Sequence, residues 1–377
     1  MSESAEIIVV GGGLFGPAIA YGLARRGCDV ALLDDGDDVL RAARGNFGLV
    51  WVQSKGMGMQ RYQDWSRESA ELYPDFAAEL KELTGIDVIY RRGGLQLLLG
   101  DEEVEAKQAE IDRMKAQAGD RDFACEIIPR DEAQQMVPEL RFGNRVTGAG
   151  YCRYDGDVNP LKLLRALLAG FQAAGGRYRS AARVETIRHD GAAFVAKTQQ
   201  GRFTAPKIVL AAGHGITRLA PMVGLYAPIR PQRGQVLVTE RAEVRLPIPL
   251  ATVRQTDEGS VQLGNSEEDV DFDDGTTLDV TRRIAARAIS LFPALAALRL
   301  VRSWGCIRVL TPDKCAIYDE SEEFPGAYVA TSHSGVTLAA VNARQVAPWI
   351  SDRETPPGFD HFSAKRFGRG EDDVQAA

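Results

Sequence analysis

The sequence predicts a two-domain α/β protein: a larger domain around a βαβ unit, and a smaller α+β domain with a mixed or antiparallel sheet. A chain of 377 residues, 45% of them hydrophobic, exceeds the usual size of one domain and can bury a large core. Residues 6–34 have the pattern strand, glycine turn, helix, strand. Further along, short apolar strands follow a long helix and are interrupted by a Pro-rich crossing from Pro221 to Pro231.

Composition narrows the possible partners and compartment. The formal net charge is -7 with both signs interspersed, so no basic stripe is available for a phosphate backbone and nucleic acid is not expected as a partner. No apolar run approaches the ~20 residues needed to span a bilayer, and the N-terminus lacks the basic head and cleavage site of a signal peptide. We therefore expect a cytoplasmic protein with no transmembrane segment.

The cysteines give no sign of a disulfide framework or a metal site. They are scattered, with no CxxC pair, at Cys28, Cys125, Cys152, Cys306 and Cys315. We expect no metal, and we expect most of these side chains to be small buried apolar groups.

The first elements form the βαβ unit. Residues 6–10 are an apolar strand that ends in glycines, residues 17–26 have helical spacing, and residues 29–34 are a second apolar run. Helices are then predicted over 60–84 and 101–118, with a strand over 91–99 between them. Their charges are typical of solvated helix faces.

The clearest helix is residues 160–174. Asn159 can cap it, Pro160 suits its first turn, and Gly175 and Gly176 end it. The elements predicted after it are strands near 182–188, 193–198, 207–211, 234–239, 260–264 and 326–330, and helices near 279–290 and 337–350, the last one after a turn at Gly335. The polar tail beyond about 364 is expected to fray.

Residues 11–16, GGGLFG, match the GxGxxG fingerprint of a Rossmann-type unit, in the required place between a strand and a helix. Gly11 allows the tight turn, Gly13 lets a pyrophosphate approach the backbone, and Gly16 lets the helix pack on the strand. Asp34, at the end of the next strand, would accept hydrogen bonds from a ribose. The fingerprint does not separate FAD from NAD, and a glycine turn without a ligand stays open.

Five ordered stretches carry a resemblance over nearly the whole chain: the fingerprint through Asp34, the loop 44–48, the helix 160–174 with its continuation to Val184, the segment 208–213, and the pair 305–313 and 333–339. Together they resemble the FAD-dependent D-amino-acid oxidase superfamily, which includes glycine oxidase, sarcosine oxidases and D-amino-acid dehydrogenases. Within it, Arg44 to Gln53 look most like the β-subunits of bacterial opine dehydrogenases, for octopine or nopaline, and like the similar subunit of hydrogen cyanide synthase.

The resemblance implies a discontinuous FAD-binding domain, residues 1–85, 151–225 and 301–365, and a substrate domain from 86–150 and 226–300. The cofactor residues that it implies are Gly11, Gly13, Leu14, Phe15, Gly16, Asp34, Asp35, Arg44, Gly45, Asn46, Gly48, Leu49, Val184, Ala211, Ala212, Gly213, Arg308, Ser334, Gly335, Val336, Thr337 and Leu338. Val184 would meet the adenine with its backbone, or serve only as a core valine.

Local physics suits two of these groups. The small residues 211–213 end a buried strand and would let the cofactor lie against the backbone, although a plain strand-end turn is the alternative. The N–H groups of residues 332–338, at the start of the last helix, could face the negative charge that develops on the flavin N1 and O2 edge. An ordinary Ser/Thr helix cap is the alternative for Ser334 and Thr337.

On the substrate side, Arg308 falls where the superfamily carries the arginine that grips the substrate carboxylate. A guanidinium pairs bidentately with a carboxylate, and a structural ion pair is the alternative. The superfamily's proline after this arginine is Val309 here, which weakens the match. His333 could act as a general base. Gln53 and Asn265 are placed on the substrate side by position alone.

Cys306 coincides with the cysteine that holds flavin covalently in monomeric sarcosine oxidases. Its flanking residues do not match well, so a small core cysteine and non-covalent FAD are expected. No cysteine spacing suits an iron–sulfur cluster.

The function that the resemblance implies is oxidation of the C–N bond of an amino acid or N-substituted amino acid to an imine that hydrolyses. By the same resemblance, a separate α-subunit or another acceptor would take the electrons. A self-sufficient oxidase for glycine, sarcosine or a D-amino acid stays open, as do a flavoprotein that only binds FAD or relays electrons and an NAD-dependent dehydrogenase.

Overall fold

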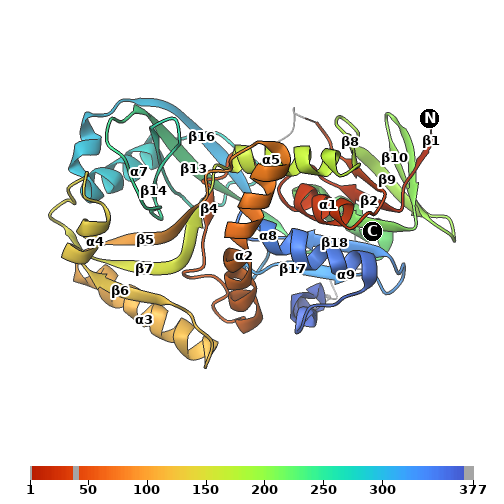
Figure 1. Ribbon diagram of the computed structural model, residues 1–377, viewed down its shortest axis with the longest axis horizontal. Coiled ribbons are helices and arrows are strands. Elements are labelled where there is room, and N and C mark those ends of the chain that lie inside the picture. Colours follow the sequence, from red (N-terminus) through yellow and green to blue (C-terminus); the bar gives the residue numbers. More distant parts are fainter. Residues whose placement is uncertain (1, 37–41, 369–377) are drawn as a thin grey trace.

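The computed structural model describes residues 2–36 and 42–368 of the chain. Within these residues the strands form four sheets, two in the lobe on the right of Figure 1 and two in the lobe on the left. Helices cover the sheets of both lobes. This architecture confirms the predicted α/β class.

The central sheet grows from the two apolar runs at the start of the chain. β2 (Ile7–Val10) and β3 (Val30–Leu33) are buried along their length and pair in parallel, as strands covered on both faces do. β12 (Lys207–Leu210) pairs with the other side of β2. The sheet continues through β18 (Ala327–Thr331), with β8 (Arg177–Arg179) and the antiparallel β17 (Ile317–Glu320) at its edges. The connection after β2 leads to β3 on one side, and later connections lead to β12 on the other side. Where the strand order reverses in this way, a crevice opens between the carboxyl ends of β2 and β12.

Two predicted helices cover this sheet. α1 (Phe15–Arg25) starts directly after the glycine turn. α5 (Pro160–Ala173) has the predicted cap, because the Asn159 side chain accepts hydrogen bonds from the N–H groups of Leu161 and Lys162 at 3.2 and 3.1 Å.

The last helix begins two residues later than predicted and is not uniform. It consists of α8 (Ala339–Val341), a π-helical turn η4 (Asn342–Val346) and α9 (Ala347–Asp352). The carbonyl oxygens of Val336 and Thr337 accept hydrogen bonds from the hydroxyls of Tyr73 and Ser69, and the N–H of Ala339 reaches the carbonyl of Val336, only three residues back, at 3.2 Å. Side chains of a distant helix therefore hold residues 336 and 337 outside the helix.

A small sheet lies beside the central one. It contains β9 (Val184–His189), β10 (Phe194–Thr198), β11 (Gly201–Ala205) and β1 (Ser2–Ser4). The sequence predicts β9 and β10, but β1 and β11 are too polar or too short to show an apolar pattern.

The left lobe of Figure 1 holds the other two sheets. One contains β4 (Leu49–Val50), β5 (Arg91–Leu99), β6 (Cys125–Pro129) and β7 (Val146–Asp157). The other contains β13 (Arg230–Arg241), β14 (Val253–Gln255), β15 (Ser260–Leu263) and β16 (Leu300–Leu310). The helices of this lobe are α3 (Asp101–Ala118), α4 (Arg130–Met136) and α7 (Leu278–Leu291). A bridge between Leu95 of β5 and Leu250, in the segment before β14, lies over an apolar core to which both sheets contribute.

Helix α2 (Gln60–Thr84) runs between the lobes, as Figure 1 shows. Ser69 and Tyr73 bind the backbone in front of α8, while the Gln63 side chain donates to the carbonyl of Met114 on α3 at 2.9 Å. One helix thus fixes the segment before α8 relative to the left lobe.

Two long strands, β7 and β16, were not predicted, and both cross proposed domain boundaries. β7 is rich in glycine and buries two aspartates, so its pattern does not alternate. β16 begins with four exposed residues and pairs with β13 along nearly its whole length. The division at residues 150/151 and 300/301 stays a proposal.

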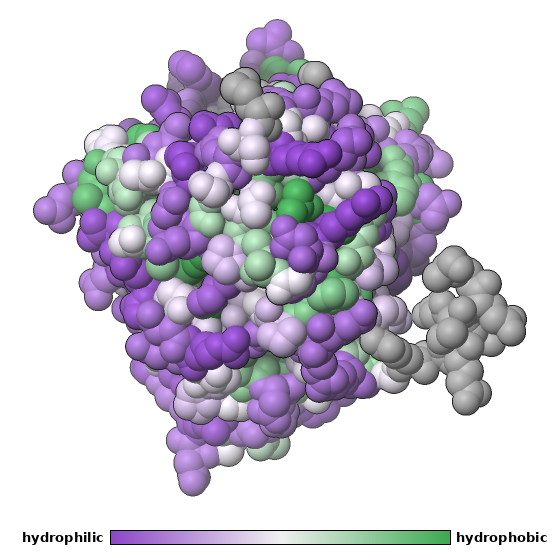
Figure 2. Space-filling model, turned by 90° about the vertical axis from the view of Figure 1, so that its right-hand side faces the viewer, coloured by the Kyte–Doolittle hydropathy of each residue, from purple (hydrophilic) through white to green (hydrophobic). Residues whose placement is uncertain are grey.

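The chain ends in short turns, η5 (Phe359–Phe362) and η6 (Ala364–Phe367), so the predicted fraying does not begin at 364. Residues 369–377 of the predicted tail lie outside the described residues. Figure 2, which views the right-hand lobe end-on, shows mostly hydrophilic side chains with small hydrophobic groups between them. No helix in ranges 2–36 and 42–368 is long and apolar enough to cross a membrane.

Candidate active site

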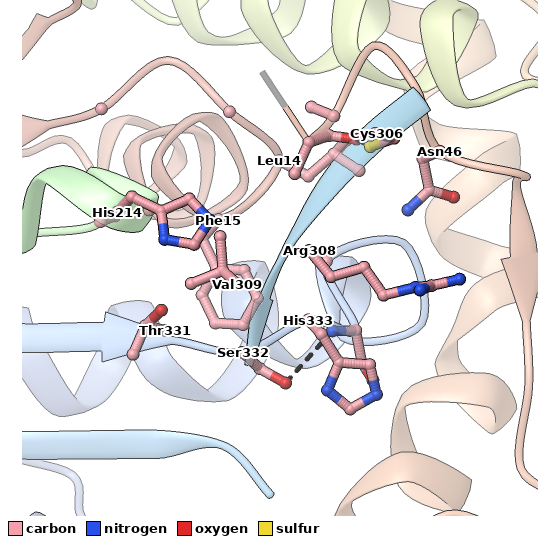
Figure 3. A pocket seen from close by; sticks show the side chains of 18 of the residues that line it. Leu14, Phe15, Asn46, His214, Cys306, Arg308, Val309, Thr331, Ser332 and His333 are labelled. Carbon is pink, nitrogen blue, oxygen red and sulfur yellow. Dashed lines mark hydrogen bonds between the residues drawn. The ribbon is translucent and has the colours of Figure 1, made fainter. Parts of the chain in front are cut away.

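A cavity of about 590 Å³ opens where the carboxyl ends of the parallel strands meet the β13–β16 sheet. This is the size range of small-molecule and cofactor sites. Its walls come from both lobes, and Figure 3 shows part of its lining, with Arg308 reaching in from β16 close to His333.

The glycine turn forms one end of the cavity, and its glycines are needed for different reasons. Gly11 has φ +116°, and a Cβ there would lie 2.4 Å from the carbonyl oxygen of Ala211. A Cβ on Gly16 would lie 1.8 Å from the carbonyl oxygen of Gly11. A Cβ on Gly13 would meet no atom within 4 Å, because it would project into open space. Gly11 and Gly16 are therefore needed by the fold, while Gly13 keeps space for a ligand.

Asp34 lines the same end of the cavity and also stabilises the glycine turn. Its carboxylate accepts hydrogen bonds from the N–H of Gly12 at 2.9 Å and from the hydroxyl of Tyr178 at 3.0 Å. Tyr178, on β8, was not predicted, because a tyrosine on a short edge strand gives no distinctive signal. The role of Asp34 toward a ribose stays a prediction.

Backbone N–H groups lie unused at both ends of the cavity. Within the part of the chain that the structure describes, those of Gly13, Gly335 and Val336 donate no hydrogen bond. A buried N–H without an acceptor is unfavourable, so these groups suit a ligand that brings acceptors of its own. A pyrophosphate at Gly13 and a flavin pyrimidine edge at Gly335 and Val336 would bring them, so the residues present fit FAD.

Most of the predicted cofactor residues line the cavity. The structure brings together Gly11, Gly13, Leu14, Phe15, Asp34, Asp35, Gly45, Asn46, Leu49, Val184, Ala211, Ala212, Gly213, Arg308, Ser334, Gly335, Val336 and Thr337. The predicted substrate-side residues His333 and Asn265 also line it.

Four predicted cofactor residues do not line the cavity. Gly16 and Gly48 meet backbone carbonyls instead, since a Cβ on Gly48 would lie 2.4 Å from the carbonyl oxygen of Val158. Leu338 is fully buried in the core, and Arg44 lies outside the lining. A direct contact of these four residues with the cofactor therefore does not follow from the structure.

Thr337 lines the cavity, but its hydroxyl is engaged. Its Oγ1 accepts from the N–H of Trp51 at 3.1 Å and is placed to donate to the carbonyl of Leu49 at 3.4 Å. This hydroxyl ties the segment before α8 to β4 and does not cap the helix, so the helix-cap alternative for Thr337 finds no support.

Gln53, predicted on the substrate side, does not line the cavity. Its Nε2 donates to Asp155 Oδ2 at 2.7 Å, and its side chain is buried. Burial raises the pKa of Asp155 to about 7, although hydrogen bonds from Val52 and Gln53 oppose that shift. The amide of Gln53 therefore serves a buried carboxyl group and does not face the substrate side as predicted.

Arg308 lies in the cavity without an acidic partner. Its Nη1 donates to the carbonyl of Arg233 at 3.2 Å and lies 3.5 Å from Gln232 Oε1, and in the described residues it forms no ion pair. The guanidinium lies over Gly234, where an added Cβ would come within 2.3 Å of Nη2. Burial lowers the pKa of Arg308 from its usual value, and Glu267 opposes this shift. The structural ion pair that was the alternative is not present among these residues.

A second cation, Lys55, was not predicted from the sequence. Its Nζ lies 2.9 Å from Nε2 of His333 and donates to Oγ of Ser334 at 2.8 Å. Burial and then the nearby Arg308 lower the pKa of Lys55 to about 8. Lys55 lies in a loop with no periodicity, so the sequence gives no signal that could have singled it out.

His333 is held neutral by its surroundings. Burial, and then Lys55 and Arg308, lower its pKa well below the usual value. A protonated Lys55 donates to Nε2, which places the ring proton on Nδ1, and Nδ1 is buried with no partner among the described residues. The use of His333 as a general base is therefore disfavoured.

Cys306 lines the cavity next to Gly45. Burial raises the pKa of its thiol to about 11, and Arg308 opposes that shift. A thiol that stays protonated is a poor nucleophile, which agrees with non-covalent FAD. No group of three or more His, Cys, Asp or Glu that could hold a metal occurs in the part of the chain that is described.

Comparison with known proteins gives one family and several relatives. Residues 6–349 match the model of the DAO family, described as FAD dependent oxidoreductase. A protein of Rhizobium meliloti that is named as a subunit of opine oxidase is 41% identical, covering 96% of this chain and 97% of its own length, and the protein of the same name from Agrobacterium tumefaciens (strain Ach5) is 40% identical over the same shares. The crystal structure of glycine oxidase from Geobacillus kaustophilus superposes with a TM-score of 0.84 at 26% identity, covering 96% of this chain and 98% of that one.

Proposed function

The chain belongs to the family of FAD-dependent oxidoreductases, and from this premise we propose that it oxidises the C–N bond of an opine-type, N-substituted amino acid as one subunit of a dehydrogenase. FAD is its cofactor, so the alternative of an NAD-dependent dehydrogenase is excluded. Two relatives that are named as opine oxidase subunits support both the substrate class and the subunit role.

The observation that carries the substrate assignment is the Arg308 guanidinium. It lines the cavity, is partly buried and forms no ion pair among the described residues. A buried cation without a counter-ion is costly, and a substrate carboxylate would remove that cost through a bidentate pair. The amino-acid carboxylate anchored there would place its Cα inside the cavity.

Bound FAD would supply the acceptor for the hydride that leaves Cα. The residues of this chain bind and orient the substrate, because Arg308 fixes one end and the walls of the cavity limit its rotation. Two cations near His333 favour the neutral form of a bound amine, since they lower the pKa of a nearby cationic group.

The products follow from the bond that is oxidised. Loss of a hydride from Cα and a proton from nitrogen converts the C–N bond to an imine. Water then hydrolyses the imine to a free amine and a 2-oxo acid.

We propose a separate electron acceptor, because two relatives that match this chain over nearly its whole length are named as subunits. The purified chain should therefore oxidise octopine with an artificial electron acceptor but form little peroxide in air. Peroxide equal to the octopine consumed, with no acceptor or partner added, would contradict the subunit role.

The self-sufficient oxidase stays as a second candidate because glycine oxidase shares the fold over nearly the whole chain. A self-sufficient oxidase would form peroxide rapidly from glycine or sarcosine. The same assay therefore separates the two candidates.

A further inference from the structure

The cavity holds a second cation, Lys55, to which the proposed mechanism gives no part in binding the substrate. Lys55 lines the cavity, and in the described residues its ammonium contacts only the ring of His333 and the hydroxyl of Ser334. Neither contact neutralises its charge. The charges of Lys55 and Arg308 also repel each other, because Arg308 is, after burial, the second cause of the lowered pKa of Lys55.

The acidic side chains near the cavity form ion pairs with other residues, and in the described residues none of them pairs with Lys55 or Arg308. Glu267, which lines the cavity, lies 3.6 Å from Lys314, and both side chains are mostly exposed. Glu268 pairs with the buried Arg233 at 2.8 Å and also binds Gln235 and Ser266. Two partly buried positive charges therefore face one cavity without a carboxylate beside either of them in the part of the chain that is described.

A ligand with two anionic groups would match this pair. One carboxylate on Arg308 leaves the ammonium of Lys55 without a counter-ion in a partly buried site, which is unfavourable. A second carboxylate on the other side of the substrate nitrogen would pair with Lys55 and would also reduce the repulsion between the two cations. An N-(1-carboxyalkyl) amino acid has this arrangement, with a carboxylate on each carbon that flanks the secondary amine.

We propose that Lys55 binds the second carboxylate of the substrate, which makes the site selective for secondary amines flanked by two carboxylates. This inference rests on the proposed function, because it takes Arg308 as the grip for the first carboxylate. His333, which contacts Lys55 through Nε2, acts as a positioning residue that holds the ammonium toward the cavity.

The test compares two ligands that differ by one carboxylate: iminodiacetate and sarcosine. Binding of each to the oxidised, FAD-loaded chain is followed by the change in the flavin absorbance, for wild type, Lys55→Met and Lys55→Arg. Lys55→Met should weaken iminodiacetate by about 10- to 100-fold, the range of a lost hydrogen bond to a charged group. Sarcosine should change less than about threefold, and Lys55→Arg should restore part of the preference for iminodiacetate.

Lys314→Met is the matched control, because Lys314 lines the same cavity but is exposed and paired with Glu267. It should leave the preference for iminodiacetate unchanged. Equal weakening of both ligands by Lys55→Met would overturn the proposal, since Lys55 would then serve the flavin or the protein and not the second carboxylate. Failure of iminodiacetate to bind the wild type would overturn it as well.

The same titrations separate this proposal from the proposed function. Binding to the oxidised flavin needs no turnover, so Lys55 can be assigned even when octopine fails to reduce the protein. Conversely, reduction by octopine with no effect of Lys55→Met would keep the oxidation and remove the role of Lys55.

Discussion

Arg308→Ala is expected to abolish reduction of the flavin by substrate at ordinary substrate concentrations, while FAD stays bound. Removing one partner of a buried charge pair costs about 2 to 5 kcal/mol, which corresponds to roughly 30- to several-thousand-fold weaker binding. Arg308 approaches the cavity from β16, whereas the glycine turn that we propose for the pyrophosphate follows β2. An anaerobic absorbance titration measures the loss, and the flavin spectrum of the purified variant reports the retained cofactor.

Gly234→Ala tests the same role without removing the charge. The added Cβ would come within 2.3 Å of Nη2 of Arg308, so the guanidinium must move. We expect about 10- to 100-fold weaker substrate binding. Arg302→Ala is the control, because Arg302 is exposed on the same strand and should have no effect. Normal reduction of Arg308→Ala by substrate would show that the chain does not grip the carboxylate there, and an electron-relay role would then regain support.

Gly13→Val is expected to yield a folded protein without flavin. The side chain would enter the open space above the glycine turn, where the pyrophosphate is proposed to lie, and it would block the unused N–H groups beside it. The flavin absorbance of the purified variant should be lost, while its circular dichroism should match that of the wild-type chain stripped of FAD.

Gly16→Val provides the contrast. Its Cβ would lie 1.8 Å from the carbonyl oxygen of Gly11, so this variant should fail to fold and should not accumulate as soluble protein. Gly13→Ala should bind FAD more weakly than wild type but better than Gly13→Val. Full flavin content in Gly13→Val would mean that the pyrophosphate lies elsewhere.

The parts of the fold with strong local signals were predicted well. The helices over 60–84 and 101–118 and the strand over 91–99 agree with α2, α3 and β5 to the residue, because charged helix faces and glycine turns bound them clearly. β7 and β16 were missed because glycines, buried aspartates and exposed ends remove the alternation that marks a strand. Tertiary contacts set the start of the last helix, which no local pattern could show.

The residues of the candidate site were likewise predicted in part. The glycine turn was predicted from its fingerprint, and residues 211–213 and 333–337 from the family resemblance. All three line the cavity, because they follow strand ends that a parallel sheet gathers at one edge. Lys55 and Tyr178 were missed, since their positions depend on how loops and edge strands pack. Gln53 was misplaced because position along a loop does not tell which way a side chain points, and here it meets Asp155.

The central claim is that this chain itself oxidises an opine-type amino acid on its own FAD. The most direct test is an anaerobic absorbance titration of the purified chain with octopine, nopaline, sarcosine, glycine and D-amino acids. We expect octopine or nopaline to bleach the flavin to completion at one substrate per flavin, with weak or no bleaching by the others. Bleaching by glycine or sarcosine alone would replace the opine assignment with a small-amine oxidase, and no bleaching by any amine in the panel would contradict the account.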